Sequence, residues 1–364
     1  MQHPIKGTLG RDFMNLARHA GFVVIAVALF TGAPHVQAET AEMDILVGSC
    51  YTNNVLRFDG KTGAYMGEFI PAGSGGLTCP EGEMILGKDG MLYVTSFSFP
   101  PLRHPWEPQL PAPKTPDRRP TFEPTKQAVT YNDQVLRFDG KTGRFIDVFM
   151  PPSARLNGPH GLAFTKQGNA FVATRFSSSL MIYDRQKNAV RQVLVDNGAY
   201  KLQKQISPEL VFRDFNGISL GPDGKVYVSS YQTGDIFRFD EETGDLLDRF
   251  VHADDGHPMK HPHNVLFGPD NNLYVTNVQE GEHSVLRFDG RSGKYLGVFV
   301  DGKKPKIGYP SDIVFTPDGE LLLVDCPVGA ILRYDGESGA YLGTLVHSGS
   351  GLPAGATSIV LIPK

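Results

Sequence analysis

Six polar residues stand at matching positions along the chain, each just before or at the start of a short apolar run. They are Glu81 (Pro-Glu-Gly), His160 (Pro-His-Gly), Asn216 (Phe-Asn-Gly), His263 (Pro-His-Asn), Ser311 (Pro-Ser-Asp) and Thr357 (Ala-Thr-Ser). Carboxylate, amide and imidazole groups bind divalent cations, and this set does not choose among Ca, Mg, Mn and Zn. If the six converge, Glu81, Asn216 and His263 are candidate metal ligands, and His160 and His263 are candidate general acid–base groups.

A repeated phrase indicates how the chain brings these residues together. It reads VLRFDGKTGAYMGEFI from Val55, returns as VLRFDGRSGKYLGVFV from Val285, and has a degenerate copy from Met181. Its aligned aspartates are Asp59, Asp139, Asp184, Asp240, Asp289 and Asp335. The underlying period of about 45 residues, with β-rich units, is typical of a β-propeller. We expect each aspartate to cap its turn through side-chain-to-backbone hydrogen bonds.

A second phrase supplies the other half of each unit. In ISLGPDGKVYVSS (218–230) and IVFTPDGELLLVD (313–325), two apolar runs flank a Pro-Asp-Gly turn. Such runs are typical of buried strands, and this tripeptide favours a tight turn. Each unit therefore has four strands, A to D, and the six polar residues precede or begin the innermost strand A, beside the central channel.

The two ends of the chain predict how the ring closes. The strand expected at Ile45–Ser49 has no strand A before it, and Ser358–Ile362 is a lone strand A at the C-terminus. One blade would then take strand A from the tail and strands B, C and D from the head, which removes an exposed sheet edge. We predict an all-β fold, a single six-bladed β-propeller over residues 42–364.

Irregular segments gather on one face of this propeller, formed by the D–A and B–C loops. A Pro-rich insertion at 97–132 is either a lid over the channel mouth or an excursion packed on the rim, and shorter excursions cover 196–214 and 252–261. Arg175, Tyr231 and Asp325, at or after the end of a strand B, are expected at the same mouth. Arg175 either binds an oxyanion or pairs with Glu81 or a neighbouring Asp. The spacing of His257, His261 and His263 either chelates a metal or forms a hydrated rim.

Three cysteines approach the same mouth, near the closing blade. Cys50 and Cys326 follow strand B in the two blades beside the closure, and Cys79 precedes Pro80. Three is an odd number, so at most one disulfide forms. The open alternatives are a Cys50–Cys326 bond, a Cys50–Cys79 bond, or three separate thiols.

The N-terminus has the pattern of an export signal. Basic residues precede the apolar run Gly21–Phe30, and Val36-Gln37-Ala38 offers a small-x-small cleavage site. We expect a signal peptide over 1–38, an uncleaved anchor being the alternative, with no membrane span after cleavage. The mature protein would be periplasmic or secreted, and we expect a monomer.

Composition and missing motifs exclude several classes of function. Lys and Arg total 35 against 39 Asp and Glu, so no basic field favours a nucleic-acid partner. The chain has no Cys-x-x-Cys-His for haem, no nucleotide-binding P-loop, no Gly-x-Ser-x-Gly and no His-Glu-x-x-His. We therefore expect neither nucleotide nor haem as a cofactor.

The repeats resemble those of NHL-type six-bladed propellers over nearly the whole mature chain. More broadly, they are similar to the superfamily of regucalcin/gluconolactonase lactonases and streptogramin (virginiamycin B) lyases. The lactonase resemblance implies a divalent cation near Glu81-Gly82 and Asn216-Gly217, although Asp312 is displaced by one position from the expected aspartate. The lyase resemblance rests on Pro159-His160-Gly161 and Pro262-His263-Asn264, while Asn277 and Asp325 replace an expected Glu.

Two hypotheses of function follow. The first is an exported binding propeller that holds a small-molecule ligand, or a protein or glycan partner, on its loop face. The alternative is a divalent-metal-dependent hydrolase or lyase acting on a small substrate at the channel mouth.

Overall fold

The structure is a computed structural model that describes residues 42–96, 133–194 and 214–364, except 155, 176, 185, 186, 188, 280 and the side chains of 191–194. The expected signal peptide (1–38), the Pro-rich insertion (97–132) and residues 196–213 lie outside the described residues. Within the described part, no helix has the length and apolar character needed to cross a bilayer.

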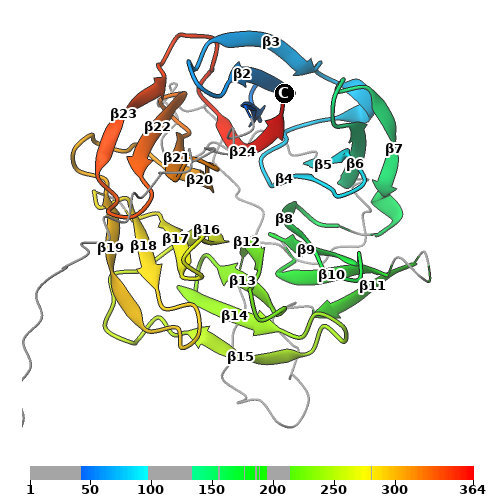
Figure 1. The fold of residues 1–364 in the computed structure, drawn as a ribbon. Helices are drawn as coiled ribbons and strands as arrows, with labels where there is room; N and C mark the ends of the chain where they lie inside the picture. Colours follow the sequence, from blue (N-terminus) through cyan, green and yellow to red (C-terminus); the bar gives the residue numbers. More distant parts are fainter. Residues whose placement is uncertain are drawn as a thin grey trace, which may run out of the picture. The chain divides into compact units, whose positions relative to one another are not determined.

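Six four-stranded antiparallel sheets form the blades of a propeller, as predicted (Figure 1). Blade 1 contains β24 (Ala356–Pro363), β1 (Met43–Ser49), β2 (Asn54–Asp59) and β3 (Tyr65–Ile70); blade 2 contains β4 (Met84–Leu86), β5 (Met91–Ser96), β6 (Gln134–Asp139) and β7 (Phe145–Met150); blade 3 contains β8 (Pro159–Phe164), β9 (Ala170–Thr174), β10 (Ser179–Asp184) and β11 (Ala189–Leu194). Blade 4 contains β12 (Phe215–Leu220), β13 (Val226–Ser230), β14 (Asp235–Phe239) and β15 (Leu246–Val251); blade 5 contains β16 (Pro262–Phe267), β17 (Leu273–Asn277), β18 (Ser284–Phe288) and β19 (Tyr295–Asp301); blade 6 contains β20 (Pro310–Phe315), β21 (Glu320–Asp325), β22 (Ala330–Asp335) and β23 (Tyr341–Val346). Two short 3-10 helices, η1 (Ser74–Gly76) and η2 (Pro152–Ala154), follow the outer strands of blades 1 and 2.

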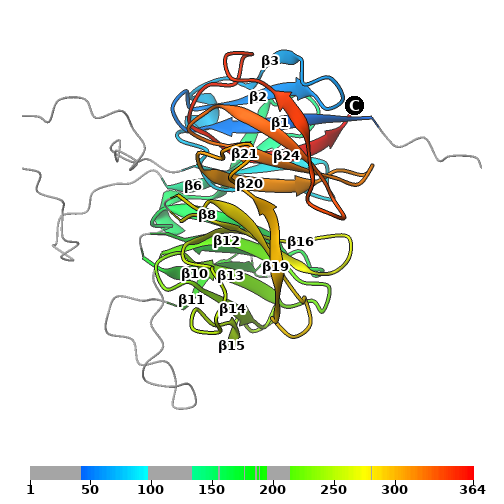
Figure 2. The same ribbon diagram turned by 90° about the vertical axis from the view of Figure 1, so that its left-hand side faces the viewer.

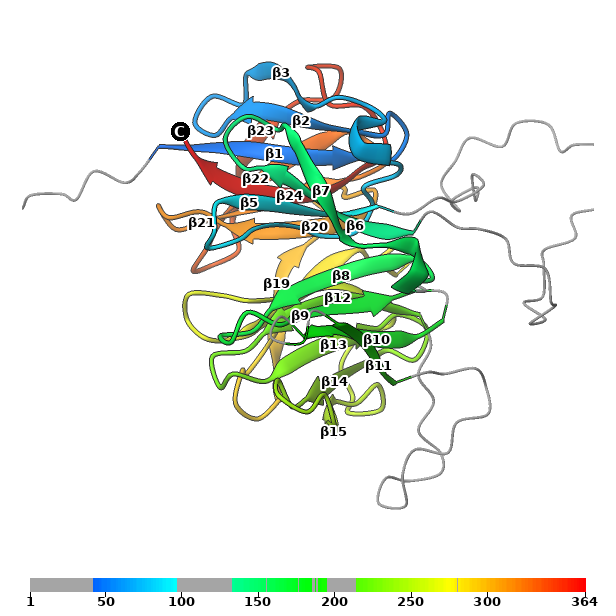
Figure 3. The ribbon, with the colours of Figure 1, turned by 90° about the vertical axis from the view of Figure 1, so that its right-hand side faces the viewer.

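The ring closes in blade 1, where the last strand of the chain pairs with the first. β24 and β1 are antiparallel, with Leu46 opposite Val360, and they lie side by side in both lateral views (Figures 2 and 3). Both strands are longer than the sequence predicted. Lys364 adds a clasp: its backbone N–H donates to the Glu42 carbonyl, and its ammonium pairs with Asp59 at 2.6 Å.

The hydrophobic core lies between neighbouring blades. The main apolar clusters each join two adjacent blades, and one of them joins Leu322 and Val324 of blade 6 to Val47 and Phe58 of blade 1. The two inner strands of each blade are mostly buried apolar runs, as in β1 and β9, whereas outer strands such as β3 and β23 are partly exposed.

The repeated aspartates cap the C–D turns, as predicted. Asp59 Oδ1 accepts the backbone N–H groups of Lys61 and Thr62 and the Thr62 hydroxyl, and Asp139, Asp240, Asp289 and Asp335 repeat the arrangement. These turns therefore keep one blade face short and regular.

Candidate functional site

The six polar residues that precede or begin the inner strands are called the mouth residues below. Backbone bulges turn three of them toward the channel. The pairing between strands A and B shifts register between Pro159 and Leu162, between Phe215 and Ile218, and between Pro262 and Val265. At each shift two residues of strand A have no partner in strand B, and the first of the two is a mouth residue: His160, Asn216 or His263. A bulge leaves a residue out of the ladder and re-aims its side chain, which is how three chemically useful groups leave the sheet.

The glycines that follow Glu81, His160 and Asn216 pack against the inner strand of the next blade. A Cβ at Gly82 would collide with the His160 carbonyl oxygen, and one at Gly161 would collide with the Asn216 carbonyl oxygen. This close approach explains the Glu-Gly, His-Gly and Asn-Gly pairs. It fixes each mouth residue relative to its neighbour.

Three of the six mouth residues form a compact cluster. Glu81, His160 and His263 each offer a ligand atom, and these atoms lie within 4.8 Å of one another. The His160 and His263 rings meet edge to face, with centroids 4.9 Å apart. All three side chains are buried, so the cluster is shielded from bulk water.

His263 is held in one orientation and one tautomer. Its Nδ1 lies 2.8 Å from the Ser311 carbonyl oxygen, which can only accept a hydrogen bond, so Nδ1 carries the proton. In the neutral ring Nε2 then carries the lone pair, the form needed by a metal ligand or a general base. The Tyr309 ring packs edge-on against the imidazole at 5.3 Å.

Arg175 joins two carboxylates at the mouth. Its Nη1 lies 2.9 Å from Glu81 Oε1, and its Nε lies 3.1 Å from Asp214 Oδ1. Burial lowers the Arg175 pKa, but the charges of Asp214 and Glu81 outweigh burial and raise it overall. Burial also raises the pKa of the Asp214 carboxyl, and Arg175 opposes that rise. Of the two roles considered for Arg175, the ion pair is the one seen.

Asn216 lies beside this network rather than in the three-residue cluster. Its Nδ2 donates to both the Asp214 carbonyl and Asp214 Oδ1. Its Oδ1 is buried and has no hydrogen-bond partner among the described residues. A buried acceptor of this kind suits a cation or a donor group of a ligand.

Two tyrosines and a thiol line the same region. Tyr231, Tyr309 and Cys326 pack together with Val278. Burial raises the pKa of Tyr309 well above its ordinary value, with the neighbouring Tyr231 adding to the effect, and burial also raises the pKa of Tyr231. Both phenols are therefore neutral hydrogen-bonding groups at pH 7.

The other predicted mouth residues connect strands and loops. The Ser311 hydroxyl donates to backbone carbonyls of Val324 and Ala356, and the Thr357 hydroxyl donates to that of Pro80. Asp325 accepts the backbone N–H groups of Gly308 and Tyr309. These contacts hold adjacent blades, and the loop carrying Tyr309, in place.

The histidines at 257, 261 and 263 do not cluster. His257 Nε2 bonds the His252 carbonyl oxygen, and His261 Nδ1 bonds the Tyr231 carbonyl oxygen while its ring stacks on Tyr231 at 4.8 Å. The rings of His261 and His263 both contact the Tyr231 ring, but no metal-ligand group among the described residues combines the three histidines. His257 is also buried, so the hydrated-rim interpretation holds only for the exposed His261.

The structure shows which of the three cysteines are paired. Cys50 and Cys79 form a disulfide, and the Cys50–Cys326 pairing and the three-thiol alternative are both wrong. Among the described residues Cys326 is a free, buried thiol, held between Tyr309 and Gly355 by its backbone hydrogen bonds. The disulfide anchors the segment that delivers Glu81, whose N–H bonds the Cys79 carbonyl at 2.7 Å.

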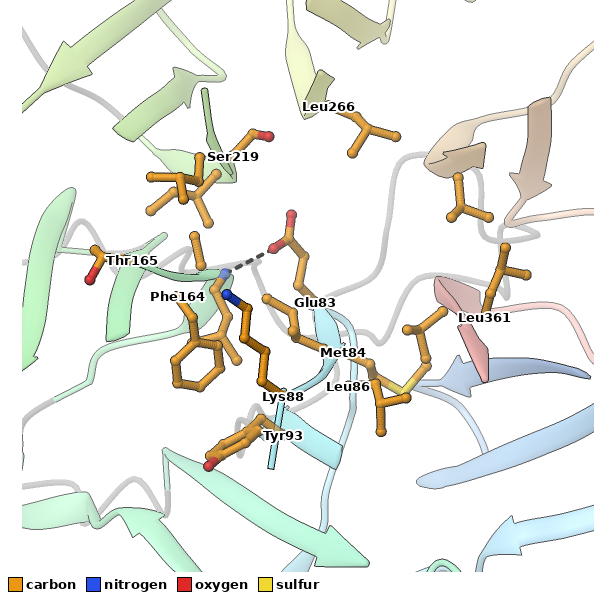
Figure 4. Close-up of a pocket in the computed structure, with 18 of the residues that line it drawn as sticks. Glu83, Met84, Leu86, Lys88, Tyr93, Phe164, Thr165, Ser219, Leu266 and Leu361 are labelled. Carbon is orange, nitrogen blue, oxygen red and sulfur yellow. Dashed lines mark hydrogen bonds between the residues drawn. The ribbon is translucent and has the colours of Figure 1, made fainter. Parts of the chain in front are cut away.

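A pair of carboxyl groups lies deeper in the channel, of which the sequence analysis named Asp312 and missed Glu83. Glu83 points into the channel, where its Oε2 accepts the Leu162 N–H (Figure 4). Asp312 accepts the backbone N–H groups of Ile313 and Ile359 and the Asn264 side-chain amide. The sequence did contain a signal for Glu83, which is two residues after the mouth residue Glu81. At the same position the other five blades have aliphatic residues: Leu162, Ile218, Val265, Ile313 and Ile359.

Burial dominates the electrostatics of this carboxyl pair. It raises the pKa of Glu83 well above the ordinary value, and the nearby Asp312 raises it further. Burial likewise raises the pKa of Asp312 to about 7, against the effect of its hydrogen bonds. The displaced aspartate of the lactonase resemblance therefore belongs to this deeper level and not to the mouth.

Comparison with known proteins identifies related folds. No protein-family model matches the chain, and no curated protein matches it. Among solved structures, a protein of unknown function from Bacteroides caccae is similar, with a TM-score of 0.58, 14% identity, and coverage of 89% of this chain and 100% of that one.

Two similar structures belong to the superfamily that the repeats resemble. The periplasmic gluconolactonase of Pseudomonas aeruginosa has a TM-score of 0.52 at 16% identity, covering 88% of this chain and 99% of its own. A catalytically inactive virginiamycin B lyase from Staphylococcus aureus, with quinupristin, has a TM-score of 0.52 at 14% identity, covering 90% and 94%. The chain thus has the six-bladed propeller fold found in lactonases and streptogramin lyases.

Proposed function

We propose that the chain is an exported, metal-dependent hydrolase or lyase that acts on a small, oxygen-rich substrate at the channel mouth. The observation that carries this proposal is the cluster of Glu81, His160 and His263, whose ligand atoms lie within 4.8 Å of one another. Three different blades supply these residues, so only the closed ring assembles the site.

The donor set fits a divalent cation. Two imidazoles and one carboxylate form a set that leaves coordination positions open in catalytic zinc sites. Imidazole ligands favour Zn, or Mn with added carboxylate character, over Ca and Mg. Asn216 Oδ1, buried without a partner among the described residues, is a further oxygen donor beside the cluster. A bound cation would polarise a substrate carbonyl oxygen.

The surrounding residues position this cluster. Arg175 holds Glu81 through Oε1, and Asp214 holds Arg175. The Ser311 carbonyl keeps the proton of His263 on Nδ1. Tyr231 and Tyr309, neutral at pH 7 and joined by a side-chain hydrogen bond, pack beside this network.

A second candidate is a non-catalytic propeller that binds a small molecule, a protein or a glycan at the same mouth. The Arg175 ion pairs favour it, because they already compensate the charges of Glu81 and Asp214 without a cation. Both candidates place the protein in the periplasm or outside the cell. The Cys50–Cys79 bond supports that location, since disulfides persist mainly in oxidising compartments.

Metal analysis of the purified mature protein tests the choice. The first proposal predicts about one equivalent of divalent metal, a higher melting temperature on adding Zn or Mn, and loss of both effects in a His160→Ala/His263→Ala variant. His347→Ala, at an exposed histidine, is the matched control. Metal-free protein whose melting temperature does not respond to Zn, Mn, Mg or Ca would leave the binding propeller as the better description.

A further inference from the structure

A cavity of about 980 Å³ occupies the end of the channel opposite the mouth. It opens among the A–B turns, where Lys88 and Thr165 line it, and its inner end reaches Glu83 (Figure 4). The volume lies in the range of small-molecule sites, which are typically apolar with a few convergent polar groups.

Aliphatic residues from all six inner strands line this cavity, among them Leu86, Leu162, Leu220, Leu266, Val314 and Leu361. Charged residues line it as well, among them Lys88, Asp89, Arg137 and Asp147. The aliphatic part of the wall favours the burial of a hydrocarbon chain.

Polar acceptors converge at the inner end. Glu83 and Asp312 both line the cavity, and neither has an ion pair with a Lys or Arg among the described residues. Glu83 remains partly accessible although it lies deep in the channel, because it faces the cavity and not the packed core.

A third acceptor lies beside the two carboxyl groups. Asn264 is only 7% exposed, lines the same cavity, and donates its Nδ2 to Asp312 Oδ1. That bond fixes the orientation of the amide, so Oδ1 is the remaining atom, and it is buried with no hydrogen-bond partner among the described residues. A buried, unmade hydrogen bond is costly, so a donor from a ligand would be favourable here.

We propose that this cavity is a second ligand site, which takes a primary ammonium group carrying an apolar tail. An ammonium has three N–H donors, which match the acceptors of Glu83, Asp312 and Asn264. The tail lies along the aliphatic walls toward the A–B turns. Lys88 and Lys166, both exposed residues of the A–B turns, also line the cavity.

This site is separate from the proposed cation site at the mouth. Glu81 and Glu83 are two residues apart in the segment before β4, and the cavity lining includes Glu83 but not Glu81. The two sites open on opposite faces, and the mouth donors include imidazoles whereas the lower acceptors are all oxygens.

Calorimetric titration of the purified mature chain with n-hexylamine tests the proposal, with 1-hexanol and hexanoate as matched probes. We expect hexylamine to bind at least tenfold more tightly than either probe, because only it carries the ammonium. Glu83→Gln and Asp312→Asn should each weaken hexylamine binding at least tenfold. Glu337→Gln, at an exposed position on a C–D turn, should leave it unchanged.

Several results would overturn the proposal. They are an absence of hexylamine binding to the wild-type chain, equal binding of 1-hexanol, and displacement of hexylamine by an equal concentration of Ca²⁺. The comparison of the three probes uses the unmodified protein, so it does not depend on whether a variant folds. The His160→Ala/His263→Ala variant should still bind hexylamine, and loss of binding there would contradict the independence of the two sites.

Discussion

The Arg175 guanidinium donates to Glu81 across the channel mouth, at 2.9 Å between Nη1 and Oε1, and thereby connects blades 2 and 3. The same side chain donates from Nε to Asp214, at the start of blade 4. One partly buried cation thus holds the carboxylate of the proposed metal cluster and connects three consecutive blades.

Replacing Arg175 tests this role. Arg175→Met should reduce the free energy of unfolding by about 3–5 kcal/mol, because it leaves Glu81 and Asp214 buried without a counter-charge. Arg137→Met, which breaks an ion pair with the half-exposed Asp147, is the control and should cost about 1 kcal/mol or less. Urea unfolding measures both. Similar losses in the two variants would show that the mouth network is no stronger than a surface pair.

The disulfide should have a measurable effect on stability. The Cys50→Ser/Cys79→Ser variant should have a free energy of unfolding about 2–4 kcal/mol lower than the wild type, as expected for removing a cross-link. The segment that carries Glu81 should also be less constrained in this variant. Cys326→Ser is the single-site comparison. Alkylation of unfolded protein should label one thiol without reductant and three with it, and three labelled thiols in the oxidised sample would contradict the Cys50–Cys79 bond.

Much of the architecture could be predicted because it repeats. The turn aspartate represented by Asp59 recurs around the ring. Each end of the chain carries only part of a blade, and this predicted that the first and last strands pair with each other. The mouth positions could be aligned for the same reason, since five of the six stand at a register shift and three of the six precede a Gly that allows close packing. Glu83 was equally visible, as the one charged residue at a level where the other blades have aliphatic side chains.

The contacts that could not be predicted depend on loop paths. Asp214 reaches Arg175 from a segment that lies outside the repeat, and nothing in its local sequence indicates that partner. The choice of Cys79 over Cys326 for Cys50 depends in the same way on how the segment after η1 returns to the mouth. Spacing alone does not determine either path.

The C-terminal clasp should depend on pH. Lys364 lowers the pKa of Asp59, with the Thr62 hydrogen bonds adding to the effect. A lowered carboxyl pKa contributes stability that is present above its unfolded value of 3.8 and lost as the pH falls below it. Lys364→Ala should therefore lower the urea midpoint at pH 7, and the difference from wild type should narrow toward pH 3. The substitution keeps the backbone hydrogen bond to Glu42, so a difference independent of pH would mean that the Lys364 side chain acts through packing and not through its charge.

The carboxyl group of Asp312, deep in the channel, should make stability depend on pH in the opposite direction. Its pKa is about 7 in the folded chain, because burial disfavours its charge, against 3.8 as the ordinary value. The folded state then binds more protons than the unfolded state between these values, so stability falls as the pH rises from about 4 to 7. The difference corresponds to at most roughly 4 kcal/mol, and Glu83, which faces Asp312, titrates in the same direction.

Urea unfolding of wild type and Asp312→Asn between pH 4.5 and 8 measures this effect. The variant should lose part of the decline in stability with rising pH, while its stability at any single pH also reflects altered hydrogen bonds to Ile313 and Ile359. The slope is therefore the informative quantity. Hexylamine at saturating concentration should raise the stability of the wild type above pH 7 more than that of Asp312→Asn, since an ammonium compensates the carboxylate charge that burial disfavours. Identical slopes in the two proteins would mean that Asp312 is not the group that titrates.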